Sequence, residues 1–502
     1  MKDETIGIQG LAFHEPLLFD QGSKGRTACS LPESDVPEVK PERLLPKKLL
    51  RHDIPGFPEL SEVEVVRHFT RMSQWNYGVD LGFYPLGSCT MKYNPKINED
   101  VWRLPGFSRA HPYQPESLAQ GALQLMFELE QYLAEVSGME RVSLQPAAGA
   151  HGELLGMMLI RAFLESKGNP RKRVLVPDSA HGTNPASSAL CGYQVIQIKS
   201  GPKGCVEPRA VAEAMDEDVA AIMVTNPNTL GLFEEHIAEI AKIVHGKGGQ
   251  VYCDGANLNA IMGISRPGDT GIDVLQFNLH KTFSVPHGGG GPGAGPVGRK
   301  AHLAPCMPIP VVERKGDRFV LNHNLPSSVG KVRAFYGNFA ALVRAYAYIR
   351  SLGPSGLRRV AEVAVINANY LMSQLKGHYH LPYDKFCKHE CVFSDARQIP
   401  HDVHTLDIAK RLMDYGFHPP TIYFPLIVRG ALMIEPTETE SKETLDQFIA
   451  AMKKIAEEAE REPELVRSAP HKTKISRLDE VKAARQPNLR WKGKGPVEES
   501  AR

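Results

Sequence analysis

The chain contains no long apolar run and no start typical of a secreted protein. Its longest apolar stretches, such as residues 421–428 (TIYFPLIV), are far shorter than the roughly 20 residues that a membrane-spanning helix needs. The first ten residues, MKDETIGIQG, lack the apolar core of a signal peptide. The 59 Lys and Arg residues nearly balance the 57 Asp and Glu residues, so the net charge of +2 offers no basic field for nucleic acid. We therefore expect a cytoplasmic protein that binds neither membrane nor nucleic acid.

A disulfide framework is also missing. The eight cysteines are scattered over 502 residues without regular spacing, which suits a reducing cytoplasm. The densest group is 387–391 (CKHEC), where Cys387, His389 and Cys391 alternate. No second pair of ligands follows at zinc spacing, so this group is expected to begin a strand, and no metal site is predicted.

The common nucleotide-binding loops are absent as well. Residues 293–298 match the spacing G-x-G-x-x-G, but Pro292 and Pro296 disfavour the helix that a dinucleotide site requires. A phosphate-binding loop of the Walker A type is excluded because Gly298 is followed by Arg299 and Lys300.

Short apolar runs that alternate with helical patterns are present instead. Buried strands are expected at 173–177, 194–198, 220–225, 250–254 and 274–278. Helices are expected at 61–73, where Ser61 and Glu64 form a capping box, and at 117–137 and 232–249. Strands alternating with helices predict an α/β fold with a mostly parallel sheet covered on both faces.

The same patterns suggest four parts of the chain. Residues 1–116 look like an N-terminal arm with a helical segment, and residues 117–330 hold the main series of strands. Residues 331–460 form a second, smaller α/β portion, with helices near 332–351 and 405–415 and strands near 391–395 and 431–435. Residues 461–502 are charged and contain proline, which is typical of a tail.

Two titratable residues at neighbouring strand ends suggest a cofactor. Asp254 ends one predicted strand, and Lys281 follows the next strand, 27 residues later. In open α/β sheets, ligands bind at the carboxyl ends of the strands. A carboxylate that keeps a pyridine nitrogen protonated and an amine that bonds to an aldehyde are what pyridoxal phosphate needs. Asp254 alone could equally be a helix cap, and Lys281 alone could be a solvated surface residue.

Three further strand ends carry groups that suit the same cofactor. Gly149 and Ala150 open a helix whose backbone amides could bind a phosphate. His181 follows another strand, where it could lie against a cofactor ring, and residues 225–234 offer hydroxyl and amide groups to a phenolic oxygen. Each signal is modest alone, since a loop-to-helix junction, a structural histidine and an Asn-Pro turn are ordinary features.

Six segments carry a resemblance to a known family. The segments are 83–96 (FYPLGSCTMKYNPK), 144–154 (LQPAAGAHGEL), 179–187 (SAHGTNPAS), 253–260 (CDGANLNA), 278–293 (NLHKTFSVPHGGGGPG) and 435–440 (EPTETE). Together they resemble the glycine decarboxylase P-protein of the glycine cleavage system, and the likeness extends over nearly the whole chain. The lysine-bearing half alone is present, as in the second subunit of the split, two-subunit form.

The resemblance implies a fold type I pyridoxal-phosphate enzyme, similar to aspartate aminotransferase, with Lys281 as the aldimine lysine. It implies that Asp254 pairs with the pyridinium nitrogen and that His181 stacks on the ring. Gly149, Ala150 and His151 would lie at the phosphate end. The expected cofactor-binding set is completed by Thr225, Asn226, Asn257 and His280. The run of glycines from Gly288 to Gly291 is expected to let backbone approach the cofactor closely.

The resemblance also implies the reaction and its partners. The chain would act as an oxidoreductase of glycine catabolism, decarboxylating glycine through the pyridoxal-phosphate aldimine and transferring the aminomethyl group to the lipoyl arm of H-protein. A companion subunit 1 is expected in a hetero-oligomer with two copies of each chain. The segment 83–96 could form a lid at the subunit junction or a packed N-terminal arm.

Two alternatives remain at this stage. One is another fold type I pyridoxal-phosphate decarboxylase or a cysteine desulfurase, in which Cys89 or Cys306 would carry sulfur. The other is a non-catalytic scaffolding subunit, which the joint presence of Asp254 and Lys281 disfavours.

Overall fold

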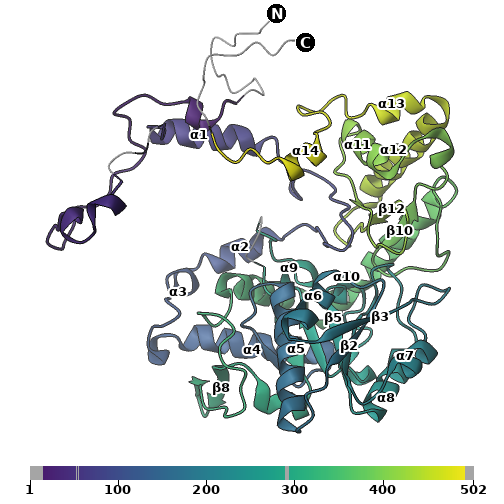
Figure 1. Cartoon of the computed structure of the whole chain (residues 1–502), viewed down its shortest axis with the longest axis horizontal. Helices are drawn as coiled ribbons and strands as arrows, with labels where there is room; N and C mark the ends of the chain where they lie inside the picture. The colour runs from purple at the N-terminus through teal and green to yellow at the C-terminus, as the bar shows by residue number, and fades with distance from the viewer. Residues whose placement is uncertain (1–14, 52–53, 55, 289–292, 492–502) are drawn as a thin grey trace, which may run out of the picture. The chain divides into compact units, whose positions relative to one another are not determined.

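The computed structural model describes residues 15–51, 54, 56–288 and 293–491 of the chain. These residues fall into two compact units (Figure 1). One unit comprises the described residues up to Gly78 together with those from Lys472 onward, and the other runs from Val79 to His471. Everything described below about strands and cavities belongs to the second unit.

The first unit contains two α-helices, α1 (Glu62–Ser73) and α14 (Glu480–Arg485). The capping box predicted for α1 is confirmed, because the Ser61 side chain accepts from the Glu64 backbone amide and the Glu64 carboxylate accepts from Ser61. The unit draws on both ends of the chain, as the contact between the rings of Phe19 and Trp491 shows, with centroids 5.3 Å apart. The described residues after 471 thus belong to the same unit as the N-terminal segment.

A seven-stranded sheet forms the centre of the second unit, in the order β1-β7-β6-β5-β4-β2-β3. Its strands are β1 (Arg141–Ser143), β2 (Arg173–Pro177), β3 (Gln194–Ile198), β4 (Val219–Thr225), β5 (Gln250–Gly255), β6 (Val274–Phe277) and β7 (Val297–Arg299). Only β7 runs against its neighbours, β1 and β6, while the other pairs are parallel. The five predicted strands are confirmed to within a residue, and the mostly parallel sheet with them.

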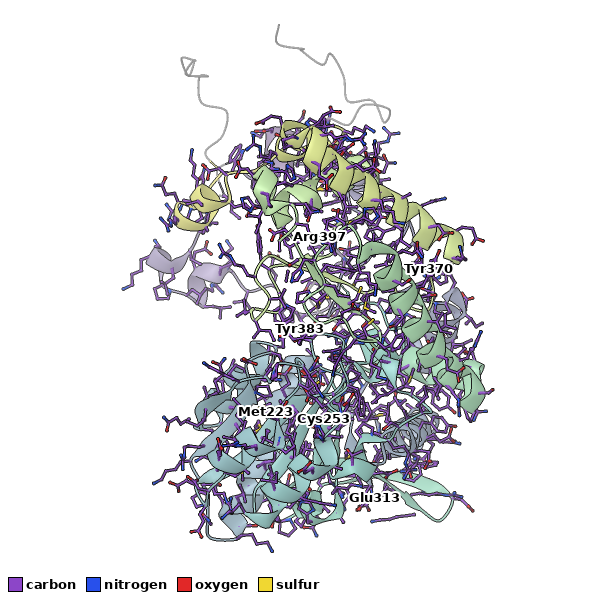
Figure 2. All side chains as sticks on the ribbon, turned by 90° about the vertical axis from the view of Figure 1, so that its right-hand side faces the viewer. Met223, Cys253, Glu313, Tyr370, Tyr383 and Arg397 are labelled. Atoms are coloured by element: carbon purple, nitrogen blue, oxygen red, sulfur yellow. The ribbon has the colours of Figure 1, made fainter. Side chains whose placement is uncertain are left out.

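Burial on both faces explains why the central strands of this sheet carry few polar residues. Leu175 and Ile222 pack into one apolar cluster, whereas Val174 and Met223 pack into another on the opposite face. Because successive side chains of a strand point to opposite faces, both faces of this sheet are covered and dry. Met223 of β4 and Cys253 of β5 lie among the strands in the body of the sheet (Figure 2).

Helices precede and connect these strands. They are α2 (Lys96–Trp102), α3 (Pro105–Ser108), α4 (Gln120–Ser137), α5 (Gly149–Ser166), α6 (Thr183–Leu190), α7 (Pro208–Ala214), α8 (Ile237–Gly246) and α9 (Leu279–Thr282). The helix predicted over 232–249 is shorter than expected. It starts at Ile237, because Asn226 and Asn228 hold residues 232–234 in a turn through bonds to the backbone amides of Leu232 and Glu234.

A smaller sheet follows, with strand order β10-β12-β11. Its strands are β10 (Cys391–Ser394), β11 (Thr421–Ile422) and β12 (Ala431–Ile434), all antiparallel, and β8 (Val311–Lys315) with β9 (Arg318–Asn322) forms a separate hairpin. The accompanying helices are α10 (Phe339–Leu375), α11 (Thr405–Asp414), α12 (Lys442–Arg461) and α13 (Pro463–Arg467). The helix predicted over 332–351 begins later and continues beyond a non-helical Gly353 to Leu375.

Candidate active site

One cavity of about 210 Å³ gathers most of the residues that the sequence singled out. The predicted residues that line it are Gly149, Ala150, His181, Thr225, Asp254, Asn257, His280 and Lys281. They come from the carboxyl ends of four parallel strands, β2, β4, β5 and β6, or from the start of α5. The topology therefore places them together, as the rule for open α/β sheets predicts.

Two predicted residues are not among those lining the cavity. The His151 ring accepts a hydrogen bond from the backbone amide of Ala147 through Nδ1, at 3.1 Å. The Asn226 side chain accepts from the Glu234 amide at 3.0 Å and shapes the turn after β4. Of the glycine run, residues 289–291 lie outside the described part of the chain.

Asp254 occupies the end of β5 and is 3% exposed. The neighbouring strands bring Thr225 and Gln276 into register with it. Its Oδ1 accepts from the backbone amide of Ala256 at 2.9 Å, which fixes the carboxylate in the turn that follows the strand. One oxygen thus serves a local turn, while the residue also forms part of the cavity wall.

Lys281 lies in the single turn of α9, directly after β6. Its Nζ donates a hydrogen bond to the backbone carbonyl of Ser88 at 2.7 Å. Ser88 belongs to the segment 83–96 and itself lines the cavity. The amine is therefore held at the cavity wall by a residue almost two hundred positions earlier in the chain.

The start of α5 provides backbone amides for an anion. Its N-cap residue, Ala148, has no side chain that can accept from the first amides of the helix. Close packing fixes this end of the helix, because a Cβ on Gly295 would lie 2.0 Å from the Ala148 carbonyl oxygen. A methyl group on Gly149 would lie 2.3 Å from Asn278 Oδ1, another group of the cavity wall. Gly149 and Gly295 are thus required by close contacts at the helix start.

Several polar atoms of the cavity wall lack a hydrogen-bond partner among the described residues. They are Glu153 Oε2, Thr225 Oγ1, Asn257 Oδ1 and His280 Nδ1, all of them buried. Buried polar groups are normally satisfied, so unpaired atoms that line one cavity indicate a polar ligand. An aldehyde-reactive amine, a carboxylate, uncapped amides and these unpaired groups together suit a phosphorylated heteroaromatic aldehyde.

His181 is joined to Glu153 through a hydroxyl group. The Thr183 Oγ1 lies 2.8 Å from His181 Nδ1 and 2.8 Å from Glu153 Oε1. Loss of surrounding water lowers the pKa of His181, opposed by Asp254 and assisted by Lys281. Burial and the Asp254 carboxylate raise the pKa of Glu153 to about 8. At neutral pH, Glu153 therefore carries a proton.

The histidines around Lys281 are uncharged at neutral pH. Burial lowers the pKa of His280 to about 3 and that of His287 to about 4, with further lowering by Lys281. Their rings meet edge to face with centroids 5.0 Å apart. Neither imidazole thus serves as a general acid at pH 7, although the ring nitrogen that lacks a proton can accept a hydrogen bond.

Sequence analysis missed six residues of the cavity wall: Ser88, Glu153, Thr183, Thr229, Ala256 and Asn278. A signal existed for Glu153, because it is the single carboxylate in the otherwise apolar run that begins α5. The others lie within or beside quoted motifs, but nothing in their residue types distinguishes them from turn residues.

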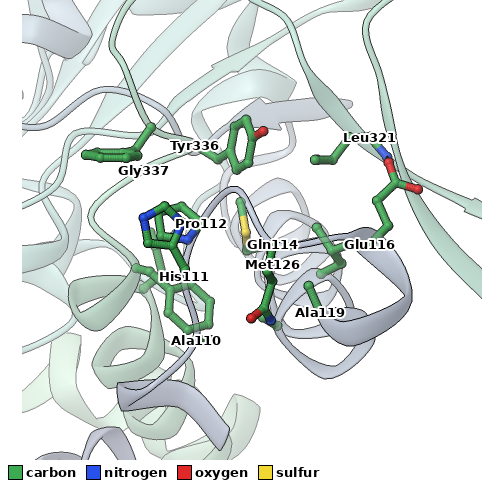
Figure 3. A pocket seen from close by; sticks show the side chains of 15 residues that line it. Ala110, His111, Pro112, Gln114, Glu116, Ala119, Met126, Leu321, Tyr336 and Gly337 are labelled. Carbon is green, nitrogen blue, oxygen red and sulfur yellow. The ribbon is translucent and has the colours of Figure 1, made fainter. Parts of the chain in front are cut away.

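A second cavity, of about 220 Å³, has a different character (Figure 3). Apolar groups such as Met126, Leu321 and Tyr336 dominate its wall. Among its lining residues, all within the described part of the chain, there is no lysine and no aspartate. The amine and carboxylate pair thus belongs to the first cavity, which we take as the candidate active site.

The raised pKa of Glu153 can be tested on the cofactor-free chain. A carboxyl whose folded pKa is raised from 4.5 to about 8 costs stability progressively as pH rises through that interval. Glu153→Gln stays neutral, so its stability relative to the parent chain should increase from pH 5 to pH 9. We expect a relative gain on the order of 3 kcal/mol, measured by urea unfolding of the cofactor-free chain. Glu165→Gln, at an exposed position of α5, is the control; an equal pH response of both variants would contradict the assignment.

The fold and the paired Asp254 and Lys281 define a class of enzyme. Solved structures with the same fold include an aspartate aminotransferase of subgroup IV from Thermus thermophilus, with a TM-score of 0.55, 14% identity, and coverage of 75% of this chain and 99% of that one. A glycine decarboxylase (P-protein) of the glycine cleavage system in inhibitor-bound form matches with a TM-score of 0.70 and 23% identity, covering 82% and 93% of the two chains. The fold is that of fold type I pyridoxal-phosphate enzymes.

Family models and relatives identify the family within that class. Residues 33–319 match the glycine cleavage system P-protein model, and residues 360–474 match the model of the glycine dehydrogenase C-terminal domain. A probable glycine dehydrogenase (decarboxylating) subunit 2 from Caldanaerobacter subterraneus subsp. tengcongensis is 59% identical over 95% of this chain and 99% of its own length. One from Alkaliphilus oremlandii is 57% identical over 95% and 98%. The chain belongs to this family of decarboxylating glycine dehydrogenases, whose cofactor is pyridoxal 5′-phosphate.

The family assignment settles the alternatives that the sequence left open. Glycine decarboxylation is confirmed over desulfuration. Cys306 is 2% exposed within an apolar cluster, so it has no access to a substrate. In addition, no described helix combines the length and apolar composition that a bilayer crossing requires.

Proposed function

We propose that this chain is the lysine-bearing subunit of a two-subunit glycine dehydrogenase and passes an aminomethyl group to the lipoyl arm of H-protein. The relatives' designation as subunit 2 supports a companion chain. The observation that carries the catalytic part is the single cavity in which Lys281, Asp254 and the start of α5 meet. A hetero-oligomer with two copies of each subunit fits this proposal.

Each group of the cavity has a role in this proposal. When bound, pyridoxal phosphate supplies an aldehyde that condenses with amines and a ring that accepts the electron pair left by departing carbon dioxide. Lys281 provides the amine that holds the cofactor until glycine replaces it. Asp254 keeps the ring nitrogen protonated, and the uncapped amides of Gly149 and Ala150 bind the phosphate. Thr225 and Asn257 offer their unpaired oxygens to polar atoms at the ring edge.

His181 and its neighbours exclude water and hold protons. The His181 imidazole at the cavity wall would cover one face of the bound ring, and Thr183 holds its Nδ1. Protonated Glu153 adds no negative charge beside Asp254, the carboxyl that we assign to the ring nitrogen. His280 and His287, both uncharged because burial holds their pKa values well below neutrality, add no positive charge near the amine that would hold the cofactor.

The exchange of labelled bicarbonate into glycine tests this function. We expect little exchange with the chain alone, and full exchange after addition of companion subunit and lipoylated H-protein. The physical reason is that the bond-breaking step needs a site closed to water and an acceptor disulfide. Each mixture is repeated with unlipoylated H-protein, which lacks the lipoyl group and with it the acceptor disulfide.

Two outcomes would contradict parts of the proposal. Full activity from the isolated chain would remove the need for the hetero-oligomer. Equal activity with unlipoylated H-protein would remove the transfer step and leave a simple decarboxylase. A chain that binds no cofactor in any mixture would be a scaffolding subunit.

A further inference from the structure

Residues 86–94, here called the strap, run past the candidate active site and are bonded on both sides. At one end Leu86 forms a β-bridge with Ile434 at the end of β12. At the other end Asn94 donates to the Ser284 carbonyl at 3.0 Å, just after α9. The strap therefore links the small sheet to the turn that carries Lys281. Sequence analysis left a lid and a packed arm open for this segment, and these bonds favour the packed arm.

Alternate residues of the strap are each bonded to a different glutamate. The Ser88 amide donates to Glu390 at 2.7 Å. The Thr90 hydroxyl and amide both donate to Glu435, at 2.6 and 3.1 Å. The Lys92 Nζ donates to the Glu438 carboxylate at 2.7 Å. Every second residue from Ser88 to Lys92 is thus fixed by a carboxyl group.

The positions of these glutamates follow from the small sheet. Glu390 comes directly before β10, and Glu435 comes directly after β12. The two strands are antiparallel, with Cys391 opposite Ile434, so both glutamates lie at the same end of the sheet. Both are completely buried. Because a buried carboxyl group is costly unless it is bonded, their place beside the strap calls for a functional reason.

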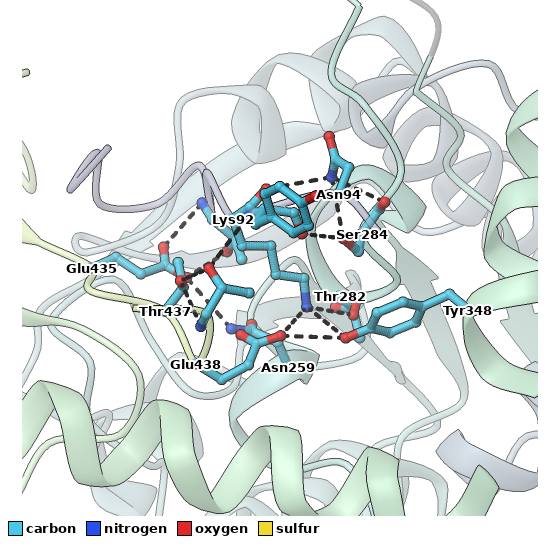
Figure 4. A network of polar contacts seen from close by, with 12 residues as sticks. Lys92, Asn94, Asn259, Thr282, Ser284, Tyr348, Glu435, Thr437 and Glu438 are labelled. Carbon is cyan, nitrogen blue, oxygen red and sulfur yellow. Dashed lines mark hydrogen bonds and ion pairs between the residues drawn. The ribbon is translucent and has the colours of Figure 1, made fainter. Parts of the chain in front are cut away.

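The strap contacts the Lys281 turn at two points. The Ser88 carbonyl accepts from the Lys281 amine at 2.7 Å. The Lys92 ammonium donates to the carbonyl of Thr282, the residue after Lys281, at 3.0 Å, and also bonds the Tyr348 hydroxyl at 3.3 Å (Figure 4). One contact holds the amine, and the other holds the backbone from which the lysine side chain extends.

The backbone of the strap adopts conformations that its side chains disfavour. Ser88 has a φ of 65° and Thr90 a φ of 44°, although neither is glycine. Such residues persist only where their surroundings fix them, and they concentrate at functional sites. Here the bonds to Glu390 and Glu435 start from these two residues, so the glutamates hold the disfavoured turn in place.

We propose that the strap is a positioning element for Lys281. Glu390, Glu435 and Glu438 anchor it, so that the Ser88 carbonyl receives the lysine amine whenever the amine is not bonded to the cofactor. The inference rests on the proposed role of Lys281. In each turnover glycine must displace this amine and the amine must later return. A fixed acceptor at the cavity wall keeps the free amine within reach and away from the substrate.

Thr90 offers the most selective variant. Thr90→Val removes the hydroxyl bond to Glu435 with little change in shape, and Thr90→Ser retains it. Thr405→Val is the matched control, because Thr405 is also fully buried and bonds a buried carboxylate, Asp395, at 2.9 Å elsewhere in the second unit. Lys92→Met is a second strap variant, which acts at the other contact with the turn.

The first measurement uses the cofactor-free full chain. Trace labelling with acetic anhydride, read by mass spectrometry, reports how available the Lys281 amine is relative to exposed lysines. We expect Thr90→Val and Lys92→Met to raise the relative labelling of Lys281 by about fivefold, as for loss of one buried hydrogen bond. Thr90→Ser and Thr405→Val should match the parent chain.

The second measurement uses the complete enzyme with its partners. A misplaced amine should lower kcat for exchange and leave the KM for glycine unchanged, and Thr90→Ser should restore kcat. Parent-like labelling in whichever of the two strap variants folds, or equal effects of Thr405→Val, would overturn the inference. Altered labelling without cofactor attachment to Lys281 would support the strap geometry but contradict the proposed function.

Discussion

Lys281→Ala is expected to abolish measurable glycine–bicarbonate exchange, lowering it by on the order of 10⁴-fold. Lys281 is the one lysine among the residues that line the cavity, and its amine is held there by the Ser88 carbonyl. The variant should still fold, because the amine makes a single hydrogen bond at a half-buried position. Borohydride treatment of the parent enzyme should fix the cofactor on the peptide that contains Lys281.

Lys300→Ala is a suitable control for this variant. Lys300 is also half-buried and donates to a backbone carbonyl, that of Gly138 at 2.8 Å, but it follows β7 outside the cavity. Its replacement should leave exchange and borohydride fixation unchanged. Fixation on any other lysine, or near-normal exchange by Lys281→Ala, would show that the cofactor assignment is wrong.

Asp254→Asn is expected to retain the cofactor and to lose roughly a hundredfold in turnover. The amide can still accept from the Ala256 backbone, so the turn after β5 stays intact. In the role that we propose for Asp254, the variant would lack the negative charge that keeps the ring nitrogen protonated while electrons enter the ring. Removing one charge-assisted hydrogen bond at a developing charge costs on the order of 3 kcal/mol, or about two powers of ten in rate.

A neighbouring buried aspartate provides the comparison. Asp273 is 5% exposed and accepts from the Val251 amide at 2.7 Å, at the opposite end of the same strand. Asp273→Asn should affect stability more than turnover of the folded enzyme. Near-normal exchange by Asp254→Asn would show that Asp254 acts only as a cap for the turn.

The large sheet was predictable because its central strands are buried on both faces. Such strands appear as short, nearly continuous apolar runs, and the run at 173–177 matches β2 residue for residue. The run at 194–198 also matches β3, although Gln194 and Gln197 of this edge strand are exposed. Once a parallel sheet is inferred, its carboxyl ends must meet at one edge. This is why eight of the ten predicted site residues line one cavity.

What could not be predicted depends on contacts between distant parts of the chain. The three-residue strands β1 and β7 are too short to have a pattern. The bonds of Ser88 and Thr90 to Glu390 and Glu435 leave no periodic signal, because turn residues meet single residues hundreds of positions away. The course of α10 beyond Gly353 was also missed, since glycine followed by proline ordinarily ends a helix.

The sequence separation of the strap from its anchors has a consequence for synthesis of the protein. Thr90 and Glu435 are 345 residues apart, and Lys92 and Glu438 are 346 apart. A nascent chain that ends before Glu435 contains Lys281 and the whole seven-stranded sheet, yet it cannot form these bonds. Since domains fold in order as the ribosome releases them, the sheet can assemble before these two anchors exist. Premature termination after residue 434 would thus yield a folded large sheet whose strap keeps the Ser88 bond to Glu390 but lacks the anchors at Glu435 and Glu438.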